Sequence, residues 1–343
     1  MRENRLGSGL RSRATKLIVS GEPLLLAAVV AGLALVAWKG DLYQISLMII
    51  VAIHVIATAG LTLLLGFAGQ VSLAQAAFYG LGAYGSMIGT VHLGWNPWLA
   101  LVATASACAV IAYVIGVPAL RLHGHYLALA TLGFGIIVNI VLVQETEITG
   151  GPTGIASIPR LSLGGIALTS DRAYFVFVWT TALALLLVCR RLVTGSAYGR
   201  VLRALQASEV ATASVGIDVA RYKVQIFVLT AVLGSVAGSL FAHYLTVISP
   251  SEFGFDVSIE FLVMAVIGGL GSVWGALLGV LVVTFLLEML RTVAPMLAPN
   301  APTSEYEVIA FGALLVLALL FLPDGLAGSW ARVTRLRGRM EAP

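Results

Sequence analysis

Long apolar runs alternate with short polar segments along most of the chain. Many of these runs approach the roughly 20 helical residues that cross a hydrocarbon core of about 30 Å. They are continuously apolar and lack the alternating ten-residue pattern of a membrane β-barrel, so they predict helices. The predicted fold is an all-α membrane protein, a polytopic bundle of about 8–10 transmembrane segments with Gly-rich interrupted helices. We expect spans at 24–38, 43–65, 76–92, 98–117, 126–143, 173–188, 224–247, 259–290 and 308–322.

Composition agrees with this pattern. The chain has 343 residues, of which only 10% are charged, and its mean hydropathy is +0.99. These values exclude an ordinary soluble domain. We expect a cytoplasmic arm at 1–23, a transmembrane domain at 24–328 and a basic cytoplasmic tail at 329–343. The arm lacks the arrangement of a cleavable signal, so the first span is expected to remain.

The longest polar stretch, 190–223, lies between two apolar runs. Only two acidic residues, Glu209 and Asp218, accompany its six cations, which are Arg190, Arg191, Arg200, Arg203, Arg221 and Lys223. A basic loop of this kind stays in the cytoplasm.

Within this stretch the sequence predicts a short helix. Ser208 is a plausible N-cap, Glu209 places a negative charge in the first turn, and Gly216 is a suitable stop. We interpret the helix as a docking surface for a cytoplasmic partner.

Charge also predicts the orientation of the chain. With both termini, the turn at 118–125 and the stretch at 190–223 inside, 16 of the 20 Lys and Arg residues lie in the cytoplasm. This asymmetry satisfies the positive-inside rule. The tail returns inside only if the segment at 259–290 enters and leaves on the same side, so we expect a reversal at 268–272.

Two Gly-rich interruptions occupy comparable places in the two halves of the chain. Non-helical backbone survives at membrane depth only inside protein or beside water, so matching interruptions indicate a transport path. The candidate pathway residues are Gly66, Gly69, Gln70, Ser72, Gln75, Gly268, Gly269, Gly271 and Ser272. The alternative is close helix packing, which small residues permit. Packing is the favoured interpretation for the pairs Gly234–Gly238 and Gly275–Gly279.

The sequence lacks the motifs of nucleotide hydrolysis, metal binding and serine hydrolysis. The sequence contains no phosphate-binding G-x-x-x-x-G-K-[ST] loop, no metal-ligand spacing and no hydrolase motif. We therefore expect a protein that is not an enzyme and holds no cofactor or metal. The ionisable candidates within spans, His54, His243 and Glu288, have no obvious partner in the sequence. Such sparse charge weakens the case for ion-coupled transport and favours an external energy source.

Five stretches together resemble a known family. They are GLTLLLGFAGQVSLAQAAFYGLGAY (60–84), LRLHGHYLALATLGF (120–134), TGGPTGI (149–155), the region 200–223, and IGGLGSVWGALLG (267–279). This combination is similar to the LivM-type permeases of branched-chain amino acid ABC importers, over roughly residues 43–326. The predicted short helix resembles the E-A-A coupling motif of these importers. Glu209, Ala211 or Ala213, and Gly216 match that motif, whereas Val210 interrupts the strict triplet.

The resemblance implies that ATPase coupling involves Ser208, Glu209, Ala211, Ala213 and Gly216. It also implies a second homologous permease, two cytoplasmic ATPases that use ATP and magnesium, and an extracytoplasmic binding protein that delivers Leu, Ile or Val. The expected location is the inner membrane, in contact with lipid and not with nucleic acid. Two alternatives stay open: a urea or short-amide permease of the same superfamily, and a secondary carrier or channel.

Overall fold

The computed structural model describes residues 29–119, 125–163, 166–168 and 170–297, together with 312, 325 and 326. The predicted arm at 1–23, nearly all of the last predicted span at 308–322, and the tail at 329–343 lie outside these residues. Almost everything described is helical, which confirms the predicted fold class of a polytopic helical membrane protein.

Six described helices are long and apolar enough to cross a membrane. They are α2 (Leu42–Ala68), α4 (Pro97–Ala119), α5 (His125–Gln144), α7 (Asp171–Thr194), α10 (Val219–Leu245) and α12 (Val273–Leu297). Shorter helices complete the bundle: an apolar helix at Val29–Lys39, α3 (Gln75–Met87) with its π-helical turn η1 (Ile88–His92), and α11 (Phe255–Gly268).

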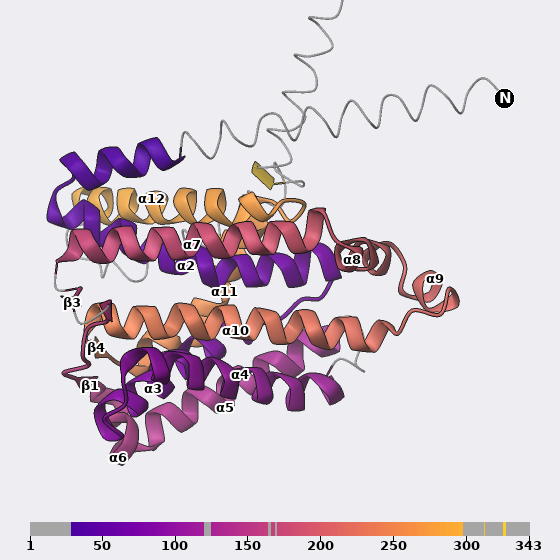
Figure 1. Ribbon diagram of the computed structural model, residues 1–343, viewed down its shortest axis with the longest axis horizontal. Helices are drawn as coiled ribbons and strands as arrows, with labels where there is room; N and C mark the ends of the chain where they lie inside the picture. Colours follow the sequence, from indigo (N-terminus) through magenta and orange to yellow (C-terminus); the bar gives the residue numbers. More distant parts are fainter. Residues whose placement is uncertain are drawn as a thin grey trace, which may run out of the picture.

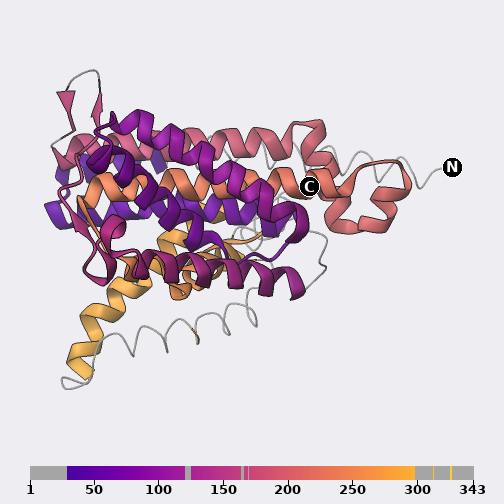
Figure 2. The ribbon, with the colours of Figure 1, turned by 90° about the horizontal axis from the view of Figure 1, so that it is seen from below.

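Short elements connect the helices at the two ends of the bundle. The end opposite α8 and α9 carries α6 (Thr146–Thr149), η2 (Gly151–Thr153), η3 (Pro250–Phe253) and four two-residue strands. The strand β1 (Ile155–Ala156) pairs antiparallel with β4 (Val247–Ile248), and β2 (Ser162–Leu163) pairs with β3 (Ile166–Ala167). At the other end, α8 (Ala197–Ala207) and α9 (Glu209–Ser214) project beyond the spans (Figures 1 and 2).

The core lies around α2 and α10, which are the most buried of the long helices. Helices α3 and α4 pack against one side of α10, and α2 packs against it as well (Figure 1). On its far side α2 is covered by α7 and α12. The helices α4 and α5 are the least covered long helices and present exposed apolar side chains.

Glycines bring α3 and α10 into backbone contact. A Cβ atom at Gly82 would stand 2.2 Å from the carbonyl oxygen of Ser235, and one at Gly238 would stand 1.8 Å from that of Tyr79. The pairs Phe78–Phe227, Gly82–Ser235 and Ser86–His243 advance together along the two helices, so α3 and α10 run parallel. Gly234 likewise packs against Gln75 and Phe78 of α3, which agrees with the packing interpretation of the Gly234–Gly238 pair.

The helices α11 and α12 form a tight hairpin. A Cβ atom at Gly279 would stand 1.8 Å from the carbonyl oxygen of Met264, and one at Gly268 would stand 1.9 Å from that of Gly275. These contacts require antiparallel helices, so the predicted reversal at 268–272 is confirmed. The positive φ of Gly269 (105°), which an L-residue rarely adopts, begins the reversal.

The expected loop at 190–223 is wrong at both of its ends. Helix α7 continues through Arg190 and Arg191 to Thr194, and α10 already begins at Val219. Arginine is a good helix former, and cations are favourable in the last turn of a helix. The polar composition therefore marked the end of the apolar surface and not the end of the helix.

We expect Gly279→Ala to destabilise the hairpin by about 1–3 kcal/mol, because its methyl group would press on the α11 backbone. Gly32→Ala is the matched control, since a Cβ atom there meets no atom within 4 Å. That variant should be neutral or slightly stabilising, by about 0.5–1 kcal/mol. Thermal unfolding midpoints of the two purified variants in detergent test this difference. Equal midpoints would contradict the backbone contact.

Candidate functional site: coupling helix and translocation segment

Helix α9 forms between the predicted start and stop signals. The Ser208 hydroxyl accepts a hydrogen bond from the Ala211 N–H (3.2 Å), which is the expected N-cap geometry. Gly216 has a φ of 81°, as a left-handed stop requires. Thr212 is buried, whereas Val210 and Val215 are 82% and 72% exposed. The helix therefore presents an apolar tip to solvent, beyond the end of the spans.

An ion pair holds α9 against α10. The Lys223 ammonium lies 2.5 Å from a Glu209 carboxylate oxygen, and Lys223 is only 5% exposed. Asp218 caps α10 by accepting a hydrogen bond from the Arg221 N–H (3.1 Å). A cleft of about 900 Å³ lies beside this contact, lined by residues of α4, α9 and α10 that include Tyr113. The position of α9 is thus fixed relative to α10.

Helix α8 links α9 to the rest of the bundle. Tyr198 packs against Tyr222 of α10, with ring centroids 5.3 Å apart. Burial and then the neighbouring Tyr222 raise the pKa of Tyr198 to about 12, so its phenol remains neutral at physiological pH. At its other end α8 meets α2, where a Cβ atom at Gly69 would lie 3.8 Å from the Gln206 side chain. A displacement of α9 can therefore reach the first interruption through α8.

The first interruption is an extended segment, 69–74, that joins α2 to α3. Exposure alternates along it: Gly69 and Val71 are exposed, whereas Gln70, Ser72 and Ala74 are buried. This period of two is that of an extended chain with one face open.

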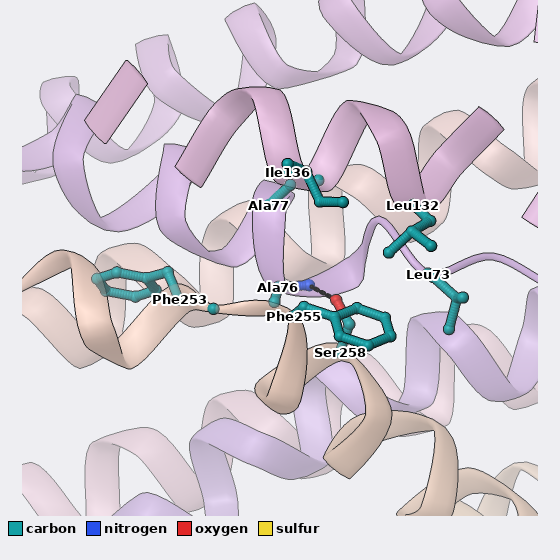
Figure 3. A pocket seen from close by; sticks show the side chains of 10 residues that line it. Leu73, Ala76, Ala77, Leu132, Ile136, Phe253, Phe255 and Ser258 are labelled. Carbon is teal, nitrogen blue, oxygen red and sulfur yellow. Dashed lines mark hydrogen bonds between the residues drawn. The ribbon is translucent and has the colours of Figure 1, made fainter. Parts of the chain in front are cut away.

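Side chains from other helices satisfy backbone groups in this segment and at the start of α3. The Leu73 N–H donates to the Thr131 hydroxyl of α5 (3.0 Å), and the Ala76 N–H donates to the Ser258 hydroxyl of α11 (3.1 Å, Figure 3). The Ala74 N–H donates to Ser72 (3.3 Å). Such bonds permit non-helical backbone at membrane depth.

The predicted polar residues of this segment have different surroundings. The Gln75 amide donates to the carbonyl oxygen of Ala57 (2.8 Å), which gives Gln75 a structural contact. Gln70 is 3% exposed, and both polar atoms of its amide lack a hydrogen-bond partner among the described residues. A buried amide in this situation requires a water molecule, a ligand or another conformation.

A small pocket lies between this segment, α5 and the start of α11. Its volume is about 10 Å³, near the minimum for one water molecule. Leu73, Leu132, Ile136, Phe253 and Phe255 surround it, and Ser258 supplies its polar atom (Figure 3). The pocket is therefore closed to an amino acid in this conformation.

The structure places the two interruptions in contact. A Cβ atom at Gly66 would stand 2.0 Å from the carbonyl oxygen of Leu270. Gly268 and Gly269 contact Gly275 of α12, whereas a Cβ atom at Gly271 would meet nothing within 4 Å. The second interruption is thus a helix-hairpin turn packed on the end of α2, in which Gly268 and Gly269 permit close packing against α12.

Several partners were not visible in the sequence. The His243 Nδ1–H donates a hydrogen bond to the Pro159 carbonyl oxygen (2.7 Å), and His243 Nε2 lies 2.8 Å from Ser86 Oγ, at hydrogen-bond distance. The Tyr43 hydroxyl donates to Glu288 (2.5 Å). His243 and Glu288, for which the sequence offered no obvious partner, therefore each have one in the structure. No sequence pattern links residues so far apart in the chain, because only helix packing brings them together.

A bundle of apolar helices with an interrupted span and a small capped helix beyond one end is the architecture of a transport permease. The model of the family described as "Branched-chain amino acid transport system / permease component" matches residues 43–319, and the chain belongs to this family. The family consists of ABC importer permeases, which work with ATPase and other subunits.

Curated relatives support this assignment. The chain is 32% identical over 297 residues to the high-affinity branched-chain amino acid transport system permease protein LivM of Escherichia coli K12, covering 80% of this chain and 67% of the relative. It is 27% identical over 287 residues to the LivH permease protein of the same strain, covering 78% and 89%. BraD of Pseudomonas aeruginosa is 27% identical over 288 residues, covering 78% and 89%. No solved structure matches the chain.

We expect Glu209→Ala to destabilise the protein more than Lys223→Met does. The first change leaves a buried ammonium without its counter-charge, at a cost on the order of 1–3 kcal/mol. Lys223→Met keeps the volume of the apolar part of the side chain. It leaves the Glu209 carboxylate, whose side chain is 41% exposed, free to be hydrated. Thermal unfolding midpoints in detergent measure the difference. The reverse order would show that the ion pair does not anchor α9.

Proposed function

We propose that this chain is the transmembrane permease subunit of an ATP-driven importer of branched-chain amino acids. The observation that carries the proposal is α9, a capped helix with an apolar tip that stands clear of the spans. Separate ATPase subunits dock on this helix through the region of Ser208, Glu209, Ala211, Ala213 and Gly216. Family membership and the names of the curated relatives support the substrate class.

The energy source in this proposal lies outside the chain. The sequence has no phosphate-binding loop, so ATP and magnesium belong to the partner subunits and this chain holds no cofactor or metal. ATP binding and hydrolysis in those subunits would shift the bundle between outward and inward openings. The movement reaches the extended segment through α8, which touches both α9 and the end of α2.

The proposed assembly contains a second homologous permease, two cytoplasmic ATPases and an extracytoplasmic binding protein. It resides in the inner membrane with both termini of this chain in the cytoplasm. The transport path passes the first interruption, where Gly66, Gly69, Gln70, Ser72 and Gln75 lie. Gly268, Gly269, Gly271 and Ser272 of the second interruption border the proposed path through Leu270, which contacts Gly66 at the end of α2.

Reconstitution into proteoliposomes tests the proposal directly. Uptake of labelled leucine, isoleucine or valine should require ATP, the ATPase subunits and the binding protein together. Gradient-driven uptake by the chain alone would assign a secondary carrier or channel instead. ATP-dependent uptake of urea or a short amide in place of the branched-chain amino acids would reassign the substrate.

Gly216→Val should uncouple transport from ATP hydrolysis while leaving the spans inserted. Gly216 has a φ of 81°, and a β-branched residue in this conformation costs about 1–3 kcal/mol. The cost comes from the backbone alone, because no atom lies within 4 Å of an added Cβ atom. Gly195→Val is the matched control in the same cytoplasmic region, since Gly195 has a φ of −108°. The measurements are membrane insertion and substrate-stimulated ATPase activity. Normal stimulation in Gly216→Val would count against coupling through α9.

A further inference from the structure

The cleft of about 900 Å³ beside α9 has no role in the proposed function. Its walls are the last two turns of α4, which contribute Tyr113 and Val117, and the first three turns of α10. Glu209 of α9 also lines it. The cleft therefore lies where two spans end, on the side of the bundle that carries α8 and α9 (Figure 1). Its volume is near the upper end of the range of about 300–1,000 Å³ that is typical of ligand pockets.

The lining of the cleft changes from charged to apolar with depth. Arg221, Gln225 and Val228 line it at positions i, i+4 and i+7 of α10, which share one helix face. At 1.5 Å per residue, Gln225 lies about 6 Å deeper along α10 than Arg221, and Val228 about 5 Å deeper again. On the opposite wall, Tyr113 and Val117 are apolar except for the phenol hydroxyl. A phospholipid shows the same order along its length, from phosphate through ester carbonyl groups to acyl chains.

The charges of the cleft balance. Two acidic and two basic residues line it: Glu209, Asp218, Arg221 and Lys223. Glu209 and Lys223 form the ion pair described above. Asp218 accepts the backbone N–H of Arg221, whereas the Arg221 guanidinium has no ion-pair partner among the described residues. One exposed guanidinium and one exposed carboxylate, three residues apart, are therefore available where α10 begins.

These features favour a zwitterionic phospholipid over other occupants. An arginine binds phosphate oxygens through two parallel N–H donors, and basic pockets between membrane helices bind phospholipid head groups. A head group with net negative charge would also meet the carboxylates of Asp218 and Glu209, whereas a neighbouring ammonium would pair with Asp218. A small soluble anion would leave the apolar end of the cleft unfilled, because Val228 lies about 13 Å along α10 from its start.

We infer that this cleft binds one phospholipid whose head group carries a phosphate and a primary ammonium, as in phosphatidylethanolamine. The phosphate binds the Arg221 guanidinium, the ammonium binds the Asp218 carboxylate, and an acyl chain lies between Val117 and Val228. This site goes beyond the proposed function and does not rest on it. The head group also covers the exposed side of Glu209, and exclusion of water there strengthens the ion pair that holds α9.

Lipid binding to the purified full-length chain in detergent tests the inference. Native mass spectrometry is used to titrate the protein with phosphatidylethanolamine or phosphatidylglycerol that carry the same acyl chains. One phosphatidylethanolamine should bind with a dissociation constant about tenfold below that of phosphatidylglycerol, as an additional charge-assisted hydrogen bond provides. Arg221→Gln keeps the backbone N–H that Asp218 accepts, and it should weaken phosphatidylethanolamine binding about tenfold. Arg203→Gln, at an exposed arginine of α8 outside the cleft, is the matched control and should bind as the unchanged protein does.

Asp218→Asn tests the ammonium contact separately. Asparagine caps a helix as well as aspartate does, so α10 is preserved while the negative charge is lost. The dissociation constants of the two lipids should then converge.

The outcomes that would overturn the inference are distinct. Unchanged binding in Arg221→Gln, or equal losses in the two arginine variants, would show that the lipid does not occupy this cleft. Equal affinity of the unchanged protein for both lipids would contradict the zwitterionic head group, and so would an unaltered preference in Asp218→Asn. If the unchanged protein retained neither lipid, the cleft would belong to another occupant and the inference would be wrong. None of these measurements involves ATP, ATPase subunits or uptake, so the proposed function is tested independently of them.

Discussion

The architecture depends on one constraint, that every backbone polar group at membrane depth needs a partner other than lipid. The segment 69–74 departs from helix, and a hydroxyl group of α5 accepts its Leu73 N–H, while a hydroxyl group of α11 accepts the Ala76 N–H at the start of α3. Thr131 and Ser258 therefore determine where the neighbouring helices must lie.

Close backbone contacts supply the complementary constraint. Where Gly82 and Gly238 join α3 to α10, and Gly279 joins α12 to α11, the helices behave as fixed pairs. Helix α8 has a contact of the same kind, because a Cβ atom at Gly199 would stand 1.9 Å from the carbonyl oxygen of Val193 on α7. Helix α8 contacts α2, α7 and α9, so it connects α9 to the end of α2, where segment 69–74 begins. Rigid pairs joined by a loose segment suit a transporter with two conformations.

Local signals in the sequence predicted the helices and α9 well. Apolar length predicted α2, α4 and α5 within a few residues, whereas α10 begins before the predicted span, and the Ser208 cap and Gly216 stop predicted α9. The reversal at 268–272 was predictable because, with the basic segments all on the cytoplasmic side, the number of membrane crossings required the chain to turn back there. The partners of Gln75, His243 and Lys223 were not predictable, since each arises from packing between helices distant in the sequence. The end of α7 was predicted too early because Arg190 and Arg191 look like the start of a loop, although arginine is readily accommodated in the last turns of a helix.

The sequence by itself determined that the chain is a membrane bundle, which segments interrupt it and which short helix it exposes. These properties follow from local hydropathy, caps and glycines, which need no knowledge of neighbours in space. Only the tertiary structure decided which interruption is a packed hairpin and which is a non-helical segment with alternate residues exposed. That distinction depends on contacts such as Gly268 with Gly275 and Leu73 with Thr131, which exist only once the helices have assembled.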